Sequence, residues 1–175
     1  MQARCREVDP TLHYQRQLKP SSCYVYQVER DGSSFVLKIA EDPWDKKHLR
    51  NEERALSLSP DVDGITHLVH AYRPTPRSYP RAILKEYIEG RSPILRGQKS
   101  NPQLQSTLER TVRELHDRRI ANLDLVYKNI IIPPDETQLI IVDLGTALVY
   151  PKIYEHAFCG ARDSDHRMID RMWEL

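Results

Sequence analysis

Cysteine is scarce and unpatterned in this chain of 175 residues. Cys5, Cys23 and Cys159 are far apart, odd in number and show no C-x-x-C spacing. A disulfide framework or a zinc site needs paired or closely spaced cysteines. The sequence therefore predicts neither of them and favours a reducing compartment such as the cytoplasm.

An excess of charge of one sign and a long apolar run are also missing. The 26 Lys and Arg residues almost balance the 25 Asp and Glu residues, so no strong field is directed at nucleic acid. No apolar run approaches the roughly 20 residues that cross a membrane. The N-terminal stretch MQARCREVDP lacks the apolar core of a secretory signal. We therefore expect a protein that binds neither nucleic acid nor membranes, with one domain or two small lobes. No feature indicates an oligomeric state.

The first half of the chain contains several extended segments. Side chains alternate in character over residues 24–28, Asp31-Gly32 is typical of a hairpin turn, and residues 33–40 resume an extended apolar pattern. Two more extended runs cover residues 66–72 and 81–88.

A helix is expected between these strands, because Asp42 and Pro43 are typical of a helix N-cap and first turn. It is predicted over residues 43–58. Residues 1–90 should thus form a five-stranded antiparallel sheet with one helix, ending in a hinge.

The pattern changes after Gly90, and residues 91–175 are predicted to be mainly helical. Asn101-Pro102 begins a helix, and residues 129–132 and 138–144 form a pair of short strands. The apolar faces of the first and last helices are predicted from Leu104, Leu108, Val112 and Leu115, and from Met168, Met172 and Leu175. The fold class predicted is α+β.

Three small polar side chains surround the predicted pair of short strands. Asp143 leaves a buried strand just before Leu144-Gly145, and its charge needs a partner there. Asn129 lies at the other end of the same hairpin, so the two side-chain oxygens can converge on Mg²⁺, which prefers one or two protein ligands. Asp124, five positions before Asn129, can accept a proton from an attacking hydroxyl.

Lys38 is a lone charge in the apolar strand FVLKIA, which is costly unless the lysine is paired. Glu52 on the following helix is its expected counter-ion. Glu53 is the alternative, although helical phase relative to Ala55 and Leu56 favours Glu52. The sequence therefore combines a base, two metal ligands and a paired lysine.

Four stretches, in this order, resemble the motifs of the protein-kinase-like fold. They are FVLK ending at Lys38, the hinge-like LKEYIEG, DLVYKN from Asp124 to Asn129, and DLG from Asp143 to Gly145. The resemblance covers most of the chain. It implies a two-lobed fold with an antiparallel-sheet N-lobe and a truncated, mainly helical C-lobe.

The resemblance also implies roles for the polar residues. Lys38 would contact the α- and β-phosphates of ATP, and Glu52 would orient it. Asp124 would be the catalytic base, while Asn129 and Asp143 would hold Mg²⁺.

Further residues have supporting roles in the same resemblance. Lys128 would be a charge near the transferred phosphate, and Asp165 on the last helix would brace the catalytic loop. The backbone of Glu86 and Ile88 would meet the nucleotide base. Ser21, Ser22 and Val25 would complete the nucleotide site, with the serine hydroxyls replacing glycine amides. His116 is expected to be structural, making a hydrogen bond near the base of the loop.

Three features differ from the family pattern. The segment LKPSSCYVY, at the place of the glycine-rich loop, contains no glycine, and Pro20 removes one amide. Asn122-Leu123 replaces His-Arg before the catalytic aspartate, and no A-P-E motif follows Asp143. We favour an atypical Ser/Thr protein kinase that uses ATP and Mg²⁺. A pseudokinase that binds protein partners, and a small-molecule phosphotransferase, are the alternatives.

Overall fold

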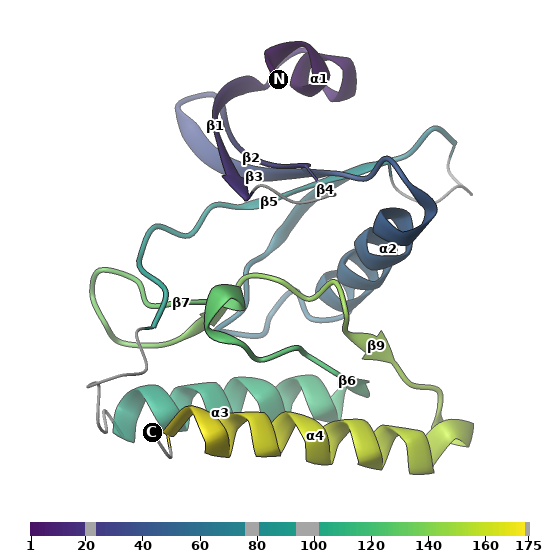
Figure 1. Cartoon of the computed structure of the whole chain (residues 1–175), viewed down its shortest axis with the longest axis vertical. Coiled ribbons are helices and arrows are strands. Elements are labelled where there is room, and N and C mark those ends of the chain that lie inside the picture. Colours follow the sequence, from purple (N-terminus) through teal and green to yellow (C-terminus); the bar gives the residue numbers. More distant parts are fainter. Residues whose placement is uncertain (20–23, 76–80, 94–101, 174–175) are drawn as a thin grey trace.

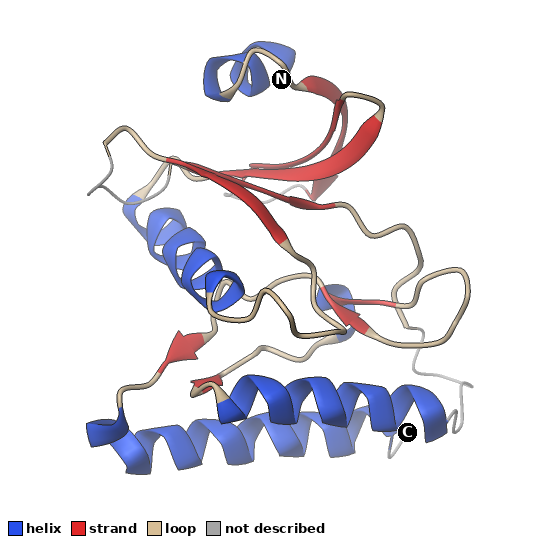
Figure 2. Ribbon diagram, turned by 180° about the vertical axis from the view of Figure 1, so that it is seen from behind, coloured by secondary structure: helices blue, strands red, loops and turns tan. Residues whose placement is uncertain are grey.

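An antiparallel sheet lies at one end of the molecule, and two long helices lie side by side at the other (Figures 1 and 2). The structure is a computed structural model that describes residues 1–19, 24–75, 81–93 and 102–173. Within these residues the chain is α+β, with five strands in the main sheet and four α-helices.

The main sheet has five strands, as predicted, and contains the four extended segments that the sequence locates, whereas β1 lies in a segment where no strand was located. Its order is β1-β2-β3-β5-β4, with all neighbours antiparallel. Asp31 and Gly32 both have positive φ, 53° and 76°, which confirms the predicted turn between β2 and β3. The strands are β1 (His13–Lys19), β2 (Tyr24–Arg30), β3 (Ser33–Ile39), β4 (Leu68–Tyr72) and β5 (Ala82–Glu86).

Helix α2 (Pro43–Ser57) packs beside this sheet and follows the predicted start signal. The Asp42 side chain accepts a hydrogen bond from the Asp45 amide at 2.7 Å, so it caps the helix as expected. A second helix in this half, α1 (Gln2–Val8), shows that our prediction of a single helix was wrong. Of the residues of α1 only Cys5 is buried, so no apolar periodicity indicates this helix in the sequence.

Helices α3 (Pro102–Asp117) and α4 (Glu155–Trp173) form the opposite end. The predicted core residues of α3, Leu104, Leu108, Val112 and Leu115, are all buried. Helix α4 begins ahead of the predicted segment, and Leu175 lies outside the described residues.

Four two-residue strands connect the sheet to this helical end. Strand β7 (Ile130–Ile131) pairs with β8 (Ile140–Ile141), which confirms the predicted hairpin in a shorter form. Strand β6 (Ile120–Ala121) pairs with β9 (Leu148–Val149). Single 3₁₀ turns, η1 (Tyr127–Asn129) and η2 (Lys152–Tyr154), precede β7 and α4.

The larger hydrophobic core joins α3, α4 and the short strands to the end of α2 and the loop after it. Gly64 in that loop has φ +83°, and a Cβ there would lie 2.2 Å from Thr111 Oγ1 on α3. The Gly64 carbonyl accepts a hydrogen bond from the Ile141 amide at 2.9 Å. The absence of a side chain at Gly64 thus allows this loop to pack against α3 and to form a hydrogen bond with β8. The loop, which leads from α2 to β4, is thereby attached to the β7–β8 hairpin. In the part of the chain described here, no helix is long and apolar enough to cross a membrane.

Candidate functional site

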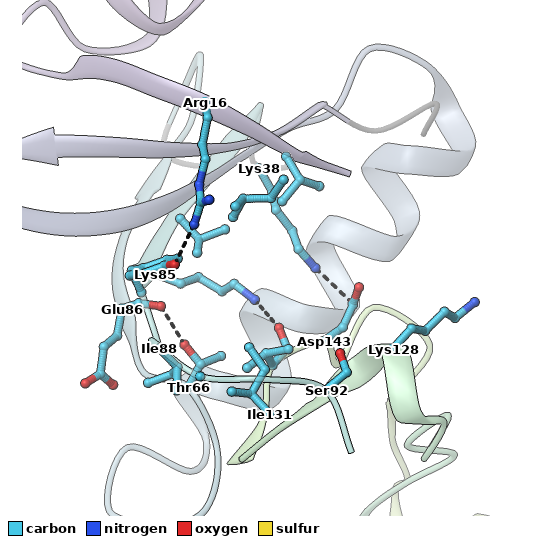
Figure 3. A pocket seen from close by; sticks show the side chains of 16 residues that line it. Arg16, Lys38, Thr66, Lys85, Glu86, Ile88, Ser92, Lys128, Ile131 and Asp143 are labelled. Atoms are coloured by element: carbon cyan, nitrogen blue, oxygen red, sulfur yellow. Dashed lines mark hydrogen bonds and ion pairs between the residues drawn. The ribbon is translucent and has the colours of Figure 1, made fainter. Parts of the chain in front are cut away.

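A pocket of about 340 Å³ lies between the main sheet and the β7–β8 hairpin (Figure 3). Six of the predicted site residues line this pocket: Val25, Lys38, Glu86, Ile88, Lys128 and Asp143. The other lining residues are Arg16, Leu18, Val36, Thr66, Lys85, Tyr87, Gly90, Ser92, Ile131 and Val142. Ser21 and Ser22 lie outside the described residues. The structure therefore brings segments from both halves of the sequence to one cavity.

Lys38 on β3 is buried and paired with two carboxylates. Its Nζ lies 2.7 Å from Glu52 Oε2 and 2.9 Å from Asp143 Oδ1. Burial alone would lower the pKa of Lys38, but the charges of Glu52 and Asp143 outweigh it and raise the pKa above its ordinary value. Lys38 is thus a fixed cation at the inner end of the pocket.

Glu52, not Glu53, is the counter-ion of Lys38. Glu52 is almost completely buried, with 1% of its surface exposed, whereas Glu53 forms an ion pair with Arg73. The helical phase of Glu52 places it on the buried face of α2 with Ala55 and Leu56, as the sequence predicts.

Lys85 on β5 is a second buried lysine, which the sequence reasoning missed. Its Nζ donates a hydrogen bond to Glu52 Oε1 at 2.5 Å. It also donates to the Val142 carbonyl at 2.6 Å (Figure 3). Burial lowers the pKa of Lys85, and Glu52 opposes this while Lys38 adds to it. A weaker signal was available, because Lys85 directly follows the apolar run AIL, although Glu86 stands next to it, whereas Lys38 is the lone charge in FVLKIA.

Asp124 and Asn129 are held together on the loop before β7. Asn129 Nδ2 donates to the Asp124 carbonyl and to Asp124 Oδ2, both at 3.0 Å. The Val142 amide donates to the Asn129 carbonyl at 2.9 Å, which places Asn129 beside Asp143. The structure therefore groups the proposed base with both proposed metal ligands.

The donor set of Asn129 and Asp143 fits Mg²⁺. Asn129 turns its amide nitrogen toward Asp124, so its amide oxygen faces the other way. Asp143 Oδ1 accepts from the Gly145 amide at 3.1 Å, which fixes the carboxylate next to the glycine turn. Two hard oxygen ligands suit a cation that takes its other ligands from phosphates and water. No group of three His, Cys, Asp or Glu side chains that could hold a metal occurs in the described ranges.

Asp165 on α4 braces the loop that leads to Asp124, as predicted. Its carboxylate accepts from the backbone amides of Asn122 and Leu123, both at 2.9 Å, and lies 3.0 Å from His116 Nε2. Asp165 and His116 are both buried. The predicted hydrogen bond of His116 near the base of the loop is confirmed.

Asn122 and Thr146 join the same loop to the segment after Gly145. Asn122 Nδ2 donates to the Thr146 carbonyl at 2.8 Å, and Thr146 Oγ1 donates to the Asn122 carbonyl at 3.0 Å. Asn122 has φ +67°, a conformation that asparagine tolerates better than most residues. Asn122 thus links the loop that carries Asp124 to the segment that follows Asp143.

The segment after β5 presents backbone groups to the pocket. The Glu86 amide donates to the His67 carbonyl, and the Glu86 carbonyl accepts from Thr66 Oγ1, both at 3.0 Å. Within the described chain, the backbone amide and carbonyl of Ile88 have no hydrogen-bond partner. At the mouth, Arg16 Nη2 donates to the Tyr87 hydroxyl at 2.9 Å, and the exposed Lys128 directs its ammonium outward (Figure 3).

The pocket carries a small excess of positive charge. Four cations, Arg16, Lys38, Lys85 and Lys128, line it against two carboxylates, Glu86 and Asp143, and the buried Glu52 behind the lining offsets one further positive charge. The Glu86 side chain points away from the cavity (Figure 3).

Comparison with protein-family models and with curated proteins finds no match to this sequence.

Proposed function

We propose that this chain is an ATP- and Mg²⁺-dependent phosphotransferase with a protein-kinase-like fold, acting on a Ser or Thr hydroxyl of a protein. The observation that carries the proposal is the position of Lys38 Nζ, 2.7 Å from Glu52 and 2.9 Å from Asp143. Residues 1–90 would be the N-lobe and residues 91–175 a minimal C-lobe, with the pocket between them.

The backbone of the hinge segment suits adenine. Adenine offers an exocyclic N–H donor next to a ring-nitrogen acceptor. The Glu86 carbonyl is an acceptor with a second lone pair beside its bond to Thr66, and the Ile88 amide is a donor. Val25 and Val36 supply apolar contacts to the base from the sheet.

The triphosphate would lie toward Lys38 and Asp143. In the transfer step, the oxygen of the acceptor hydroxyl attacks the γ-phosphorus, and the bond to the β–γ bridging oxygen breaks. Asp124 accepts the proton of that hydroxyl, and Asn129 holds Asp124 in position through its amide nitrogen. Mg²⁺, held by Asn129 and Asp143, would neutralise phosphate charge. Positioning and charge neutralisation account for most of the catalysis in such a site.

A thermal-shift experiment tests nucleotide binding directly. A ligand that binds only the native state at 100 times its Kd stabilises the fold by about 2.7 kcal/mol. We expect ATP with Mg²⁺ to raise the melting temperature, and ATP with EDTA to raise it much less. Absence of a shift at millimolar ATP with Mg²⁺ would contradict the proposal.

A pseudokinase that binds protein partners is the second candidate. One observation favours it: the segment LKPSSCYVY, at the place of the glycine-rich loop, contains no glycine whose backbone could approach phosphates closely. Incorporation of labelled phosphate into a protein or peptide acceptor by the purified protein would exclude this candidate. Transfer only to small-molecule hydroxyls would instead support a small-molecule phosphotransferase.

A further inference from the structure

Lys85 closes a ring of charged contacts behind the pocket. Lys85 Nζ contacts Glu52 Oε1, Glu52 Oε2 contacts Lys38, and Lys38 contacts Asp143. The ring closes through the backbone, because Lys85 also donates to the carbonyl of Val142, the residue before Asp143. Four separate segments, β3, α2, β5 and the end of β8, are thus joined through one set of contacts.

The ring contains two ammonium groups and two carboxylates, so its charges balance as long as Asp143 faces Lys38. Binding of a cation by Asp143 would draw this carboxylate away from Lys38. Lys38, Lys85 and Glu52 would then carry one uncompensated positive charge. Without Lys85, the remaining pair of Lys38 and Glu52 would carry none.

We propose that Lys85 is a positioning residue that supplies, through its contact with Glu52, the uncompensated charge by which the pocket holds the phosphates of the nucleotide. The inference rests on the proposed function and deepens it. Lys38 touches the phosphates, and Lys85 acts through Glu52. One carboxylate oxygen of Glu52 contacts Lys85 and the other contacts Lys38, so the negative charge of Glu52 is shared between two lysines and does not fully neutralise Lys38.

Burial of Lys85 argues against a purely space-filling role. Its side chain is 1% exposed, and a buried ammonium costs more than an apolar side chain of the same volume. Both acceptors of Lys85 are next to residues of the proposed site. Glu52 contacts Lys38, the proposed phosphate contact, and Val142 directly precedes Asp143, the proposed metal ligand. The charge of Lys85 is therefore close to both Lys38 and Asp143.

The test compares ligands with and without phosphates in the Lys85→Met variant. Calorimetric Kd values would be measured for ATP and for adenosine, each with Mg²⁺. We expect Lys85→Met to raise the Kd of ATP on the order of tenfold and the Kd of adenosine less than about twofold, because a nearby buried charge acts mainly on the charged ligand. Lys152→Met, an exposed lysine on η2, is the matched control and should change neither affinity.

The variant Lys85→Arg separates the charge of Lys85 from the identity of its side chain. It keeps a cation beside Glu52 and the Val142 carbonyl, and Glu52 stays in place to hold Lys38. We expect its ATP affinity to stay within about threefold of the unmodified chain. If Lys85→Met does not fold, this variant decides, and a tenfold loss of ATP affinity with unchanged adenosine affinity in Lys85→Arg would overturn the proposal.

The outcomes separate the two proposals. An unmodified chain that binds no ATP with Mg²⁺ would overturn the proposed function and this inference with it. Binding by the unmodified chain together with equal losses of ATP and adenosine affinity in Lys85→Met, or with no loss, would overturn the role of Lys85 alone.

Discussion

The carboxylate of Asp165 on α4 lies 3.0 Å from Nε2 of His116 near the end of α3. The same carboxylate receives the two backbone amides that precede Asp124 in the chain, those of Asn122 and Leu123. The contact between α3 and α4 therefore also determines the path of the loop that carries the proposed base.

Replacing Asp165 should destabilise the fold and the loop together. Asp165→Ala leaves the buried Leu123 amide, the partly exposed Asn122 amide and the buried His116 without their acceptor, and we expect a loss of about 2–4 kcal/mol in the free energy of unfolding. Urea denaturation measures it. Asp170→Asn, exposed on the same helix, is the control and should change stability by less than about 0.5 kcal/mol.

Asp124→Ala should separate chemistry from binding. Removal of a general base lowers phosphotransfer by about 10²–10⁴-fold, while Lys38 and Asp143 still hold the nucleotide. The rate of labelled phosphate transfer and the ATP-induced shift in melting temperature should thus respond differently. Asp135→Ala, in an exposed turn, should leave the transfer rate intact. An unchanged rate in Asp124→Ala would contradict the assigned role.

Asp143→Asn should remove the effect of the metal. In the proposed site the carboxylate would supply the charge that binds Mg²⁺, and an amide lacks this charge. The additional stabilisation that Mg²⁺ gives to the ATP complex, measured by melting temperature, should disappear in this variant. A full Mg²⁺ effect in Asp143→Asn would place the metal elsewhere.

Gly64→Ala should be strongly destabilising for two reasons. Alanine is strained at φ +83°, and its Cβ would lie 2.2 Å from Thr111 Oγ1. We expect a loss of about 2–4 kcal/mol by urea denaturation, part of which Thr111→Ala recovers in the double variant. Gly160→Ala on α4 has no atom within 4 Å of the new Cβ, so it should instead stabilise by about 0.5–1 kcal/mol.

The Tyr72 hydroxyl donates to Asp9 Oδ2 at 2.7 Å, which predicts a pH-dependent contribution to stability. Burial would raise the pKa of Asp9, but hydrogen bonds from Thr11 and Tyr72 outweigh it and hold the pKa below the ordinary value of 3.8. A lowered carboxyl pKa stabilises the fold above the unfolded value, and this contribution is lost as the pH falls through the folded pKa.

Tyr72→Phe should therefore cost about 1 kcal/mol at pH 7 and less below pH 3.8. Denaturant titrations at a series of pH values measure the difference. Tyr154→Phe, which removes an exposed hydroxyl, should cost nothing at either pH. A Tyr72→Phe loss that is independent of pH would show that Asp9 is not the partner that matters.

The sequence identified the elements with a periodic or capped pattern. The Asp42 cap predicts α2, and the apolar spacing of Leu104 to Leu115 predicts α3, because both signals are local. Helix α1 and the pair of β6 and β9 were missed. Helix α1 buries only Cys5, and two-residue strands are too short to show alternation.

Charge isolation in an apolar strand identifies Lys38. The same signal is weaker for Lys85, because the charged Glu86 follows it directly and the stretch LKEYIEG resembles a hinge, whose contacts are made by the backbone. The contacts between Asn122 and Thr146 are of a different kind. They depend on a positive φ at Asn122 and on a segment 24 residues away, and neither follows from the local sequence.

The ring of Lys38, Lys85, Glu52 and Asp143 has a consequence for how the molecule unfolds. Two of its members belong to strands of the main sheet, and Asp143 follows β8 in the other half. Melting of the second half alone would leave Lys38 without Asp143 and Lys85 without the Val142 carbonyl, and a buried ammonium group that loses a partner is costly. The ring therefore favours unfolding of the two halves together, although each half has a hydrophobic core of its own.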